Sequence, residues 1–335
     1  MITYDAACHI FIFLGVISTL SSSAQSKLPA ALAQSTRRAY TAMFRLFLAF
    51  LCFNQVSISQ VNVNILLAFL EFLYCNGTKY SQLLNYISAI RTFSLMYDVK
   101  IPDLKHSKIN LSLKAIQKAN PFSVKLHHLI DIPLLNSIIS TCDLTYLGYM
   151  FKSIYLLAFF GFFRLSNLVP HVISDFSMLK HLTRGDVFFS TSHVIILLKW
   201  SKTMQTNDQA KLIKLPILNN QLCPQKALKT VFQLSPGSKN TPLFQFKASD
   251  AWLPMTDNRV RCHLRNILSL LHLDSNYITF HSFRRSGASF AFNHNVSIQE
   301  IQKHGTWTSD CVWRYVSDST DAGYQVAATF ATLLS

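Results

Sequence analysis

The sequence LLAFFGFFRLSNL, residues 156–168, places a single arginine, Arg164, directly after a run of apolar residues and glycine. The run belongs to an apolar helix predicted over residues 144–162, which we expect to form the centre of a hydrophobic core. A guanidinium beside such a core is costly to bury unless it is paired or hydrogen-bonded. Arg164 is therefore either a helix-end residue that binds the last carbonyl groups of the helix or part of an anion site.

Hydrophobic periodicity on either side of this stretch predicts a mainly α-helical chain with one small antiparallel β-sheet. The predicted helices cover residues 37–53, 61–75, 80–97, 107–119, 132–141, 144–162, 225–233, 257–271, 286–294 and 298–304. The predicted strands cover residues 186–190, 194–200 and 211–216, and the polar residues 201–209 form the turn between the last two. Residues Gln34-Ser35-Thr36 are expected to cap the first helix.

The length of 335 residues suggests two domains. Residues 33–119 are predicted to form a helical domain, residues 120–126 a linker that contains Pro121, and residues 127–335 a second domain of helices and the sheet. Residues 1–32 are an uncertain N-terminal segment. Within this segment residues 10–20 are apolar, as in a signal peptide, but no basic residue precedes them, so we do not expect a secretory signal.

The basic excess points to a polyanionic partner. Thirty-one Lys and Arg residues outnumber 16 Asp and Glu residues, for a net charge of +15, and the excess is shared almost equally between residues 1–120 and 121–335. Nucleic acid contacted by both halves is the simplest partner, although a basic protein without a polyanionic partner would have the same composition. Only two of the acids are Glu, and a two-metal nuclease needs several carboxylates, so no metal-dependent chemistry is expected.

The seven cysteines are odd in number, widely spaced and without a Cys-x-x-Cys motif. This pattern argues against a disulfide framework or a zinc site and predicts a reduced, intracellular compartment. An apolar fraction of 50% excludes a disordered chain. No stretch is predicted to be a transmembrane helix.

Three later segments also carry polar residues of catalytic types. Lys199-Trp-Ser-Lys202 lies in the predicted hairpin, where a lysine is ordinarily just solvated. In His281-Ser-Phe-Arg284-Arg285, a helix would put the imidazole and the first guanidinium on one face, where they suit the oxygens of a phosphate. His304-Gly-Thr-Trp307 is followed, eight residues after the tryptophan, by Tyr315, which in isolation would be an amphipathic surface residue.

In this order the four segments resemble the tyrosine recombinases, the phage-integrase type of DNA breaking and rejoining enzyme. Arg-Leu-Ser-Asn-Leu and Gly-Thr-Trp-x-Ser-Asp are most similar to the recombinases of eukaryotic mobile elements of the Crypton or DIRS kind. The resemblance covers residues 126–316 and, less specifically, residues 33–119, which are similar to the helical core-binding domain of that family. It implies six catalytic residues, in chain order Arg164, Lys202, His281, Arg284, Trp307 and Tyr315.

The resemblance also implies a role for each of these residues in cleaving a DNA strand. Tyr315 attacks the phosphorus to form a covalent 3′-phosphotyrosyl link, and the two arginines stabilise the charge on the phosphate oxygens. His281 assists proton transfer, Trp307 donates its indole N–H, and Lys202 protonates the leaving 5′ oxygen. The covalent link retains the bond energy, so no metal, ATP or other cofactor is expected.

Three positions leave alternatives open. Lys199 competes with Lys202 for the lysine role, and His304 lies close enough in sequence to compete with Trp307. Asn167 stands where the family often has an acidic residue, and it either supports the site indirectly or only caps the following loop.

The same resemblance implies double-stranded DNA as the partner, a homo-tetramer when two DNA sites are paired, and a nuclear location if the source is eukaryotic. No membrane and no small-molecule substrate are expected. Six basic residues are candidates for contact with backbone phosphates, although each alone would be explained by solvation: Arg37, Arg38, Arg91, Lys114, Lys118 and Arg285. The apolar spacing in residues 321–335 suits packing on a neighbouring subunit or on the same domain. The competing hypotheses are a catalytically silent DNA-binding protein with this fold and a helical adaptor without nucleic acid.

Overall fold

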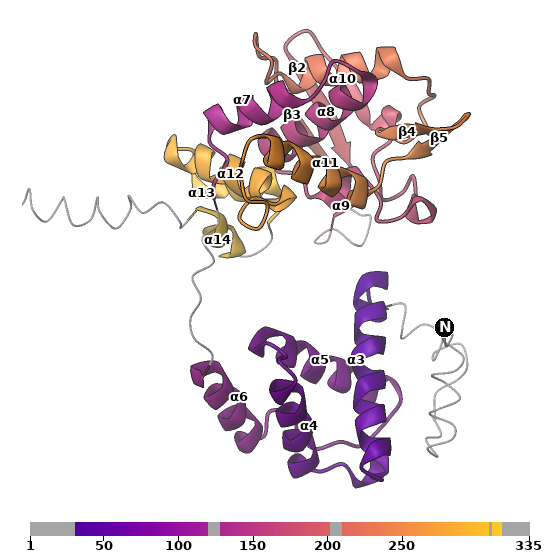
Figure 1. Ribbon diagram of the computed structural model, residues 1–335, viewed down its shortest axis with the longest axis vertical. Helices are drawn as coiled ribbons and strands as arrows, with labels where there is room; N and C mark the ends of the chain where they lie inside the picture. Colours follow the sequence, from indigo (N-terminus) through magenta and orange to yellow (C-terminus); the bar gives the residue numbers. More distant parts are fainter. Residues whose placement is uncertain (1–30, 120–127, 202–209, 308–309, 317–335) are drawn as a thin grey trace, which may run out of the picture. The chain divides into compact units, whose positions relative to one another are not determined.

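The computed structural model describes residues 31–119, 128–201, 210–307 and 310–316. It consists of two compact units, residues 1–124 and 125–335, which Figure 1 colours along the sequence. Both are built mainly of helices and the second also holds a small antiparallel sheet, so the predicted fold class is confirmed. The predicted linker 120–126 and most of the predicted N-terminal segment lie outside the described residues. None of the helices in these ranges combines the length and the apolar character needed to cross a membrane.

The described part of the first unit is a group of four helices around an aromatic core. They are α3 (Gln34–Phe53), α4 (Val63–Cys75), α5 (Tyr80–Met96) and α6 (Ser107–Ala119), with a 3₁₀ turn, η2 (Ile58–Gln60), before α4. Phe44 stacks on Phe93 at 4.9 Å between ring centroids, and Phe47 meets Phe69 at 5.0 Å. Because aromatic pairs add about 1 kcal/mol beyond the burial of their area, these contacts hold α3 against α4 and α5.

In the first unit two helix starts differ from the prediction for local reasons. α3 already begins at Gln34, so the prediction of Gln34-Ser35-Thr36 as a cap is wrong and these residues form the first turn. α4 begins at Val63 instead of residue 61, because the Asn62 side chain accepts hydrogen bonds from the backbone N–H groups of Asn64 and Ile65, at 3.0 and 3.2 Å. Satisfying these donors fixes where the helix begins.

The second unit is arranged around α8 (Tyr146–Phe160), the apolar helix that the sequence predicts over residues 144–162. The other described helices are α7 (Ile132–Thr141), α9 (Leu165–Leu168), α10 (Pro224–Leu234), α11 (Asp257–Leu270), α12 (Phe280–Asn293), α13 (Ile298–Gly305) and α14 (Trp313–Val316), with 3₁₀ turns η3 (Ile173–Asp175), η4 (Arg184–Asp186) and η5 (Asp310–Val312). α8 packs against α10 and α12. At the contact with α12, a Cβ on Gly287 would lie 2.1 Å from the Phe159 carbonyl oxygen, so only glycine allows the helices to approach this closely.

In the described residues the main sheet has three antiparallel strands in the order β1 (Val187–Phe189), β2 (His193–Leu198) and β3 (Lys211–Pro216). Along β2, Val194, Ile196 and Leu198 are buried and the residues between them are partly exposed, as expected of a strand with one face on a core. A second hairpin, β4 (Gln245–Ala248) and β5 (Ala251–Pro254), is not predicted by the sequence. Its strands are short, and their burial does not alternate.

A partly buried histidine on α11 should make the second unit less stable in acid. The Nδ1 atom of His263 lies 2.8 Å from the Tyr155 hydroxyl, and its ring stacks on that of Phe151 at 3.6 Å between centroids. Burial lowers the pKa of His263 from 6.5 to about 4. The unfolded chain takes up this proton near pH 6.5, whereas the folded chain does so only near pH 4. The free energy of unfolding is therefore unaffected by His263 well above pH 6.5 and decreases as the pH falls from there toward 4.

Between about pH 7.5 and pH 5, His263 should lower the free energy of unfolding by roughly 1 kcal/mol, after allowing for the solvent that reaches the ring. Urea denaturation of the wild type and of His263→Gln at both pH values measures this difference. The exposed His272 provides a control as His272→Asn, because asparagine tolerates the left-handed backbone at that position. An equal pH dependence in the wild type and His263→Gln would contradict the prediction.

Candidate active site

Arg164, the first of the two arginines, follows a strained turn at the end of α8. Phe162 adopts a left-handed φ of 51°, which is uncommon for a residue other than glycine and costs about 1 kcal/mol or more. Arg164 follows as the N-cap of the short helix α9 and is partly buried. Its Nη1 atom is buried and has no hydrogen-bond partner among the described residues. A guanidinium nitrogen in this state can still bind an anion.

Arg284 is the more deeply buried arginine. α12 begins six residues before its predicted start, so His281 and Arg284 lie on one turn of the helix, as their spacing predicts. Arg284 is 2% exposed; its Nη1 atom donates to the Phe162 carbonyl and its Nη2 atom to the Gly305 carbonyl, the latter at 2.7 Å. Burial, and then the nearby positive charge of Arg164, lower the pKa of Arg284. The side chain nevertheless stays charged, as guanidinium groups in proteins do.

Among the described residues the two arginines have no acidic counterpart. In the part of the chain that the structure describes, no carboxylate forms an ion pair with Arg164 or Arg284, and no group of three or more His, Cys, Asp or Glu side chains is placed to hold a metal ion. Two like charges held close together and partly out of water cost free energy. An anion with several oxygens, such as a phosphate, would offset that cost by accepting hydrogen bonds from both.

Aromatic rings gather at Arg284. Its guanidinium carbon lies 4.0 Å from the centroid of the Trp307 ring and 5.8 Å from that of the Tyr315 ring. The Tyr315 ring in turn lies 4.9 Å from the Trp307 ring and 5.3 Å from the His281 ring, between centroids. Tyr315 is partly exposed on α14, and its backbone carbonyl accepts a hydrogen bond from the Ser289 hydroxyl at 2.5 Å. The structure thus brings together five of the six predicted catalytic residues, since Arg164 lines a cavity together with His281, the residue whose ring faces Tyr315.

Trp307 is held by the turn that ends α13. Thr306 has a left-handed φ of 58°, and the backbone N–H of Trp307 donates to the Gln302 carbonyl at 3.1 Å. A Cβ on Gly305 would lie 1.8 Å from the Trp307 ring, so the ring rests directly on glycine backbone. The Nε1 atom of Trp307 is buried and has no hydrogen-bond partner among the residues described. Its N–H is a donor that a ligand can use.

His304, the alternative to Trp307, is engaged with the end of α8. Its Nε2 atom lies 2.9 Å from the Phe160 carbonyl oxygen, and its ring meets that of Phe162 at 4.8 Å between centroids. Burial lowers the pKa of His304, which favours the neutral ring with its N–H donated to that carbonyl. Trp307 is therefore the residue of this segment that the structure places against Tyr315.

The lysine segment is described only in part. Lys202 lies outside the described residues, as does most of the predicted turn 201–209. The Nζ atom of Lys199 lies 2.6 Å from Asp186 Oδ2, which also accepts hydrogen bonds from the backbone N–H and the hydroxyl of Thr183, at 2.7 and 2.8 Å. Asp186 is 5% exposed, so without Lys199 it would be a buried carboxylate with no counter-ion. Lys199 therefore has a structural role where it stands.

Asn167 joins the Arg164 turn to the end of strand β2. It is 1% exposed, and its Oδ1 atom accepts a hydrogen bond from the backbone N–H of Arg164 at 3.0 Å. Its Nδ2 atom donates to the Trp200 carbonyl at 3.1 Å. The side chain thus caps α9 and also reaches the residue two positions before Lys202. A carboxylate could accept the first hydrogen bond but could not donate the second.

Asn167→Asp is accordingly expected to lower the free energy of unfolding by about 2–3 kcal/mol, because it buries a carboxylate beside a carbonyl oxygen. Urea denaturation at neutral pH measures the change. Asn258→Asp on α11 makes the same substitution at an exposed position and should leave stability within about 0.5 kcal/mol of the wild type. If both variants unfold at the same urea concentration, Asn167 does not make these hydrogen bonds in solution.

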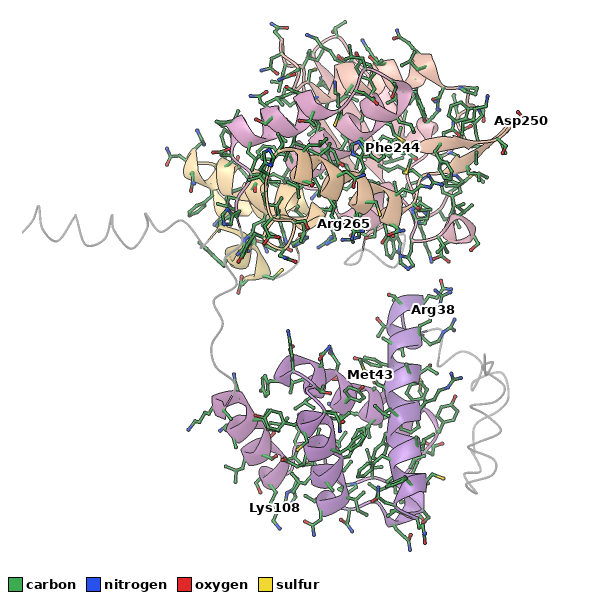
Figure 2. All side chains as sticks on the ribbon, viewed as in Figure 1. Arg38, Met43, Lys108, Phe244, Asp250 and Arg265 are labelled. Atoms are coloured by element: carbon green, nitrogen blue, oxygen red, sulfur yellow. The ribbon has the colours of Figure 1, made fainter. Side chains whose placement is uncertain are left out.

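The six candidates for DNA contact are spread over both units. Arg38, Arg91, Lys114 and Lys118 are exposed on α3, α5 and α6, whereas Arg37 on α3 and Arg285 on α12 are partly buried. Figure 2 shows Arg38 projecting from one end of α3. Exposed positions of this kind suit contacts with backbone phosphates, which position a duplex without reading its sequence.

Sequence reasoning missed the residues that act through the backbone. The carbonyl groups of Phe162 and Gly305 bind Arg284, and the Ser289 hydroxyl binds the Tyr315 carbonyl. Every residue has a carbonyl group, so no side-chain pattern marks these positions. Gly305 alone offers a clue, because a glycine two residues before a buried tryptophan leaves room for its ring.

Comparison with known proteins finds similarity only at the level of structure. No model of a protein family and no curated protein matches the sequence. The Tn1549 transposon integrase in complex with circular intermediate DNA matches with a TM-score of 0.58 at 14% identity, over 91% of this chain and 98% of that chain. The lambda integrase dimer bound to a COC′ core site matches with a TM-score of 0.56 at 14% identity, over 90% and 96%. The XerH site-specific recombinase bound to its difH substrate matches with a TM-score of 0.54 at 15% identity, over 82% and 72%. The chain therefore has the fold of these integrases and recombinases.

Proposed function

We propose that this protein is a site-specific DNA recombinase of the tyrosine type, which cleaves and rejoins DNA strands through a covalent 3′-phosphotyrosyl intermediate. The observation that carries the proposal is the cluster around Arg284. The Arg284 guanidinium, an imidazole and an indole lie against the ring of Tyr315, the charge of Arg164 lies close to Arg284, and no described carboxylate is paired with either arginine. A phosphodiester uses all of these groups at once, because the cations and N–H groups bind its oxygens while the hydroxyl attacks its phosphorus.

In the proposed reaction the phenol oxygen of Tyr315 attacks the phosphorus while the bond to the 5′ oxygen breaks. The phenol proton passes to His281 or to solvent, and Lys202 gives a proton to the 5′ oxygen, which leaves as a hydroxyl group. Arg164 and Arg284 bind the non-bridging oxygens, whose negative charge must be stabilised in the transition state. The new bond is a phosphate ester like the one that breaks, so a 5′ hydroxyl group can reverse the step without ATP.

The proposal extends to the DNA and the assembly. The Tn1549 integrase, lambda integrase and XerH structures are complexes with DNA, and lambda integrase is a dimer on its site. By analogy, double-stranded DNA is the partner of this chain, both units contact it, and four copies assemble to pair two sites. The likeness of Arg-Leu-Ser-Asn-Leu and Gly-Thr-Trp to mobile-element recombinases supports a role in the movement of a eukaryotic element, in the nucleus.

A two-step experiment tests this function even when the target sequence is unknown. DNA fragments that the protein binds are first selected from a random-sequence pool at low salt. The selected DNA is then offered with a nick beside each phosphate in turn, so that the short cleaved strand diffuses away and any covalent adduct is trapped. We expect an adduct that survives denaturing electrophoresis and disappears on protease treatment.

Two results would overturn the proposal. Salt-dependent binding with no adduct at any nick would identify a catalytically silent DNA-binding protein. An absence of binding even at low salt would favour a helical adaptor without a nucleic acid partner.

A further inference from the structure

A cavity beside the cluster shares two of its residues. It has a volume of about 230 Å³ and is lined in part by Arg164 and His281. Its apolar wall includes Phe163 and Phe280, which are buried in the core. Its other polar lining residues are Ser166, His171, Asp257 and Arg261. None of these four has a part in the reaction proposed above.

Asp257 organises the polar side of this cavity. Its Oδ2 atom lies 3.0 Å from His171 Nδ1 and 3.8 Å from Arg261 Nε. The backbone N–H of Asp257 donates to the Pro170 carbonyl at 3.0 Å, which fixes the first turn of α11 to the loop after α9. The Asp257 side chain is 20% exposed, whereas those of His171 and Arg261 are 72% and 51% exposed. One carboxylate thus orients two donors whose remaining nitrogens, Nε2 of the histidine and the Nη atoms of the arginine, have no hydrogen-bond partner within the described ranges of the chain.

The charge balance of the cavity favours an anion. Arg164 and Arg261 carry two positive charges against the single negative charge of Asp257, and two imidazole rings and the Ser166 hydroxyl add further hydrogen-bond donors. Because the cavity and the cluster share these two side chains, whatever occupies the cavity must lie next to the ligand of the cluster.

We infer that this cavity binds the phosphodiester group that neighbours the one attacked by Tyr315, with Arg261 and His171 as its ligands and Asp257 as the residue that positions them. The inference rests on the proposed function, because it takes the ligand of the cluster to be a DNA strand. Consecutive phosphates of one strand supply two anions in fixed succession, which matches a cluster and a cavity joined by shared donors. The neighbouring phosphate is bound but not attacked, since Tyr315, the proposed nucleophile, does not line this cavity.

The test neutralises one phosphate of the DNA at a time and asks which one Arg261 contacts. Wild type and Arg261→Gln are titrated with duplexes that carry a single methylphosphonate at successive positions around the cleavage site. On unmodified DNA, Arg261→Gln should bind about tenfold more weakly and reduce the slope of log affinity against log salt by about one. At one position next to the cleaved phosphate, the methylphosphonate should weaken the wild type by a similar factor and have no further effect on the variant. The affinity of His171→Gln should likewise be unaffected by a methylphosphonate at that same position.

Arg265→Gln is the matched control. Arg265, labelled in Figure 2, is exposed on the same helix, four residues further on. It is not among the residues that line the cavity. Its effects should add to those of every methylphosphonate near the cleavage site. If Arg261→Gln is also additive at every position, or binds DNA as the wild type does, the inference is wrong while adduct formation by the wild type still supports the proposed function. If the wild type binds no DNA, both fail together.

Discussion

Replacing Tyr315 with phenylalanine should abolish the covalent protein–DNA adduct and leave DNA affinity nearly unchanged. The substitution removes one oxygen atom and keeps the ring, so the contacts with Trp307 at 4.9 Å, His281 at 5.3 Å and Arg284 at 5.8 Å are retained. Loss of the nucleophile from an enzyme that depends on it costs on the order of 10⁶-fold in rate. Denaturing electrophoresis with a nicked substrate measures the loss, and mass spectrometry of the wild-type adduct should find the nucleotide on the peptide that contains Tyr315.

Tyr277→Phe is the control for this experiment. Tyr277 is exposed and pairs with the His128 ring at 5.4 Å between centroids, outside the cluster. The control should form as much adduct as the wild type. An adduct of equal yield from Tyr315→Phe would show that another residue is the nucleophile, and the proposed mechanism would then be wrong even if the protein cleaves DNA.

The regular parts of this fold follow from periodicity, and the exceptions have local causes. The apolar run before Arg164 predicts the central helix, which ends at Phe160, almost to its ends, because a helix surrounded by core must be apolar on every side. The start of α4 depends instead on one side chain, Asn62, and the hairpin of β4 and β5 depends on a register that four-residue strands cannot signal. Periodicity therefore predicts which elements exist better than where they begin.

Of the candidate site, too, the sequence predicts one part and not the other. The spacing of His281 and Arg284 predicts their common face from helix geometry alone. That Arg164 lies near Tyr315, more than one hundred residues further on, could be expected only from the order of motifs in a known family. Arg284 is held in place by carbonyl groups, and one of them belongs to Phe162, whose left-handed backbone no side-chain pattern indicates. The sequence thus predicts which side chains share a local face, whereas the contacts that hold them in place belong to the tertiary structure.

Lys202→Ala is expected to slow cleavage of ordinary DNA by about 10²–10⁴-fold, the usual contribution of a general acid. The defect should largely disappear when the 5′ bridging oxygen at the cleavage site is replaced by sulfur. A thiol is a far stronger acid than an alcohol, with a pKa near 8.5 in cysteine, so a thiolate leaves without being protonated. The ratio of single-turnover rates on the sulfur and oxygen substrates measures the effect for each protein, independently of how much of each preparation is folded.

Lys199→Ala separates the two lysines. Because Lys199 pairs with the buried Asp186 at 2.6 Å, its loss should destabilise the second unit by about 3 kcal/mol or more. It should still leave the ratio of rates on sulfur and oxygen substrates as in the wild type, since a structural defect slows both reactions alike. A raised ratio in Lys199→Ala and a normal one in Lys202→Ala would transfer the general-acid role to Lys199, and with it the ion pair to Asp186 would become the means of holding the acid in place.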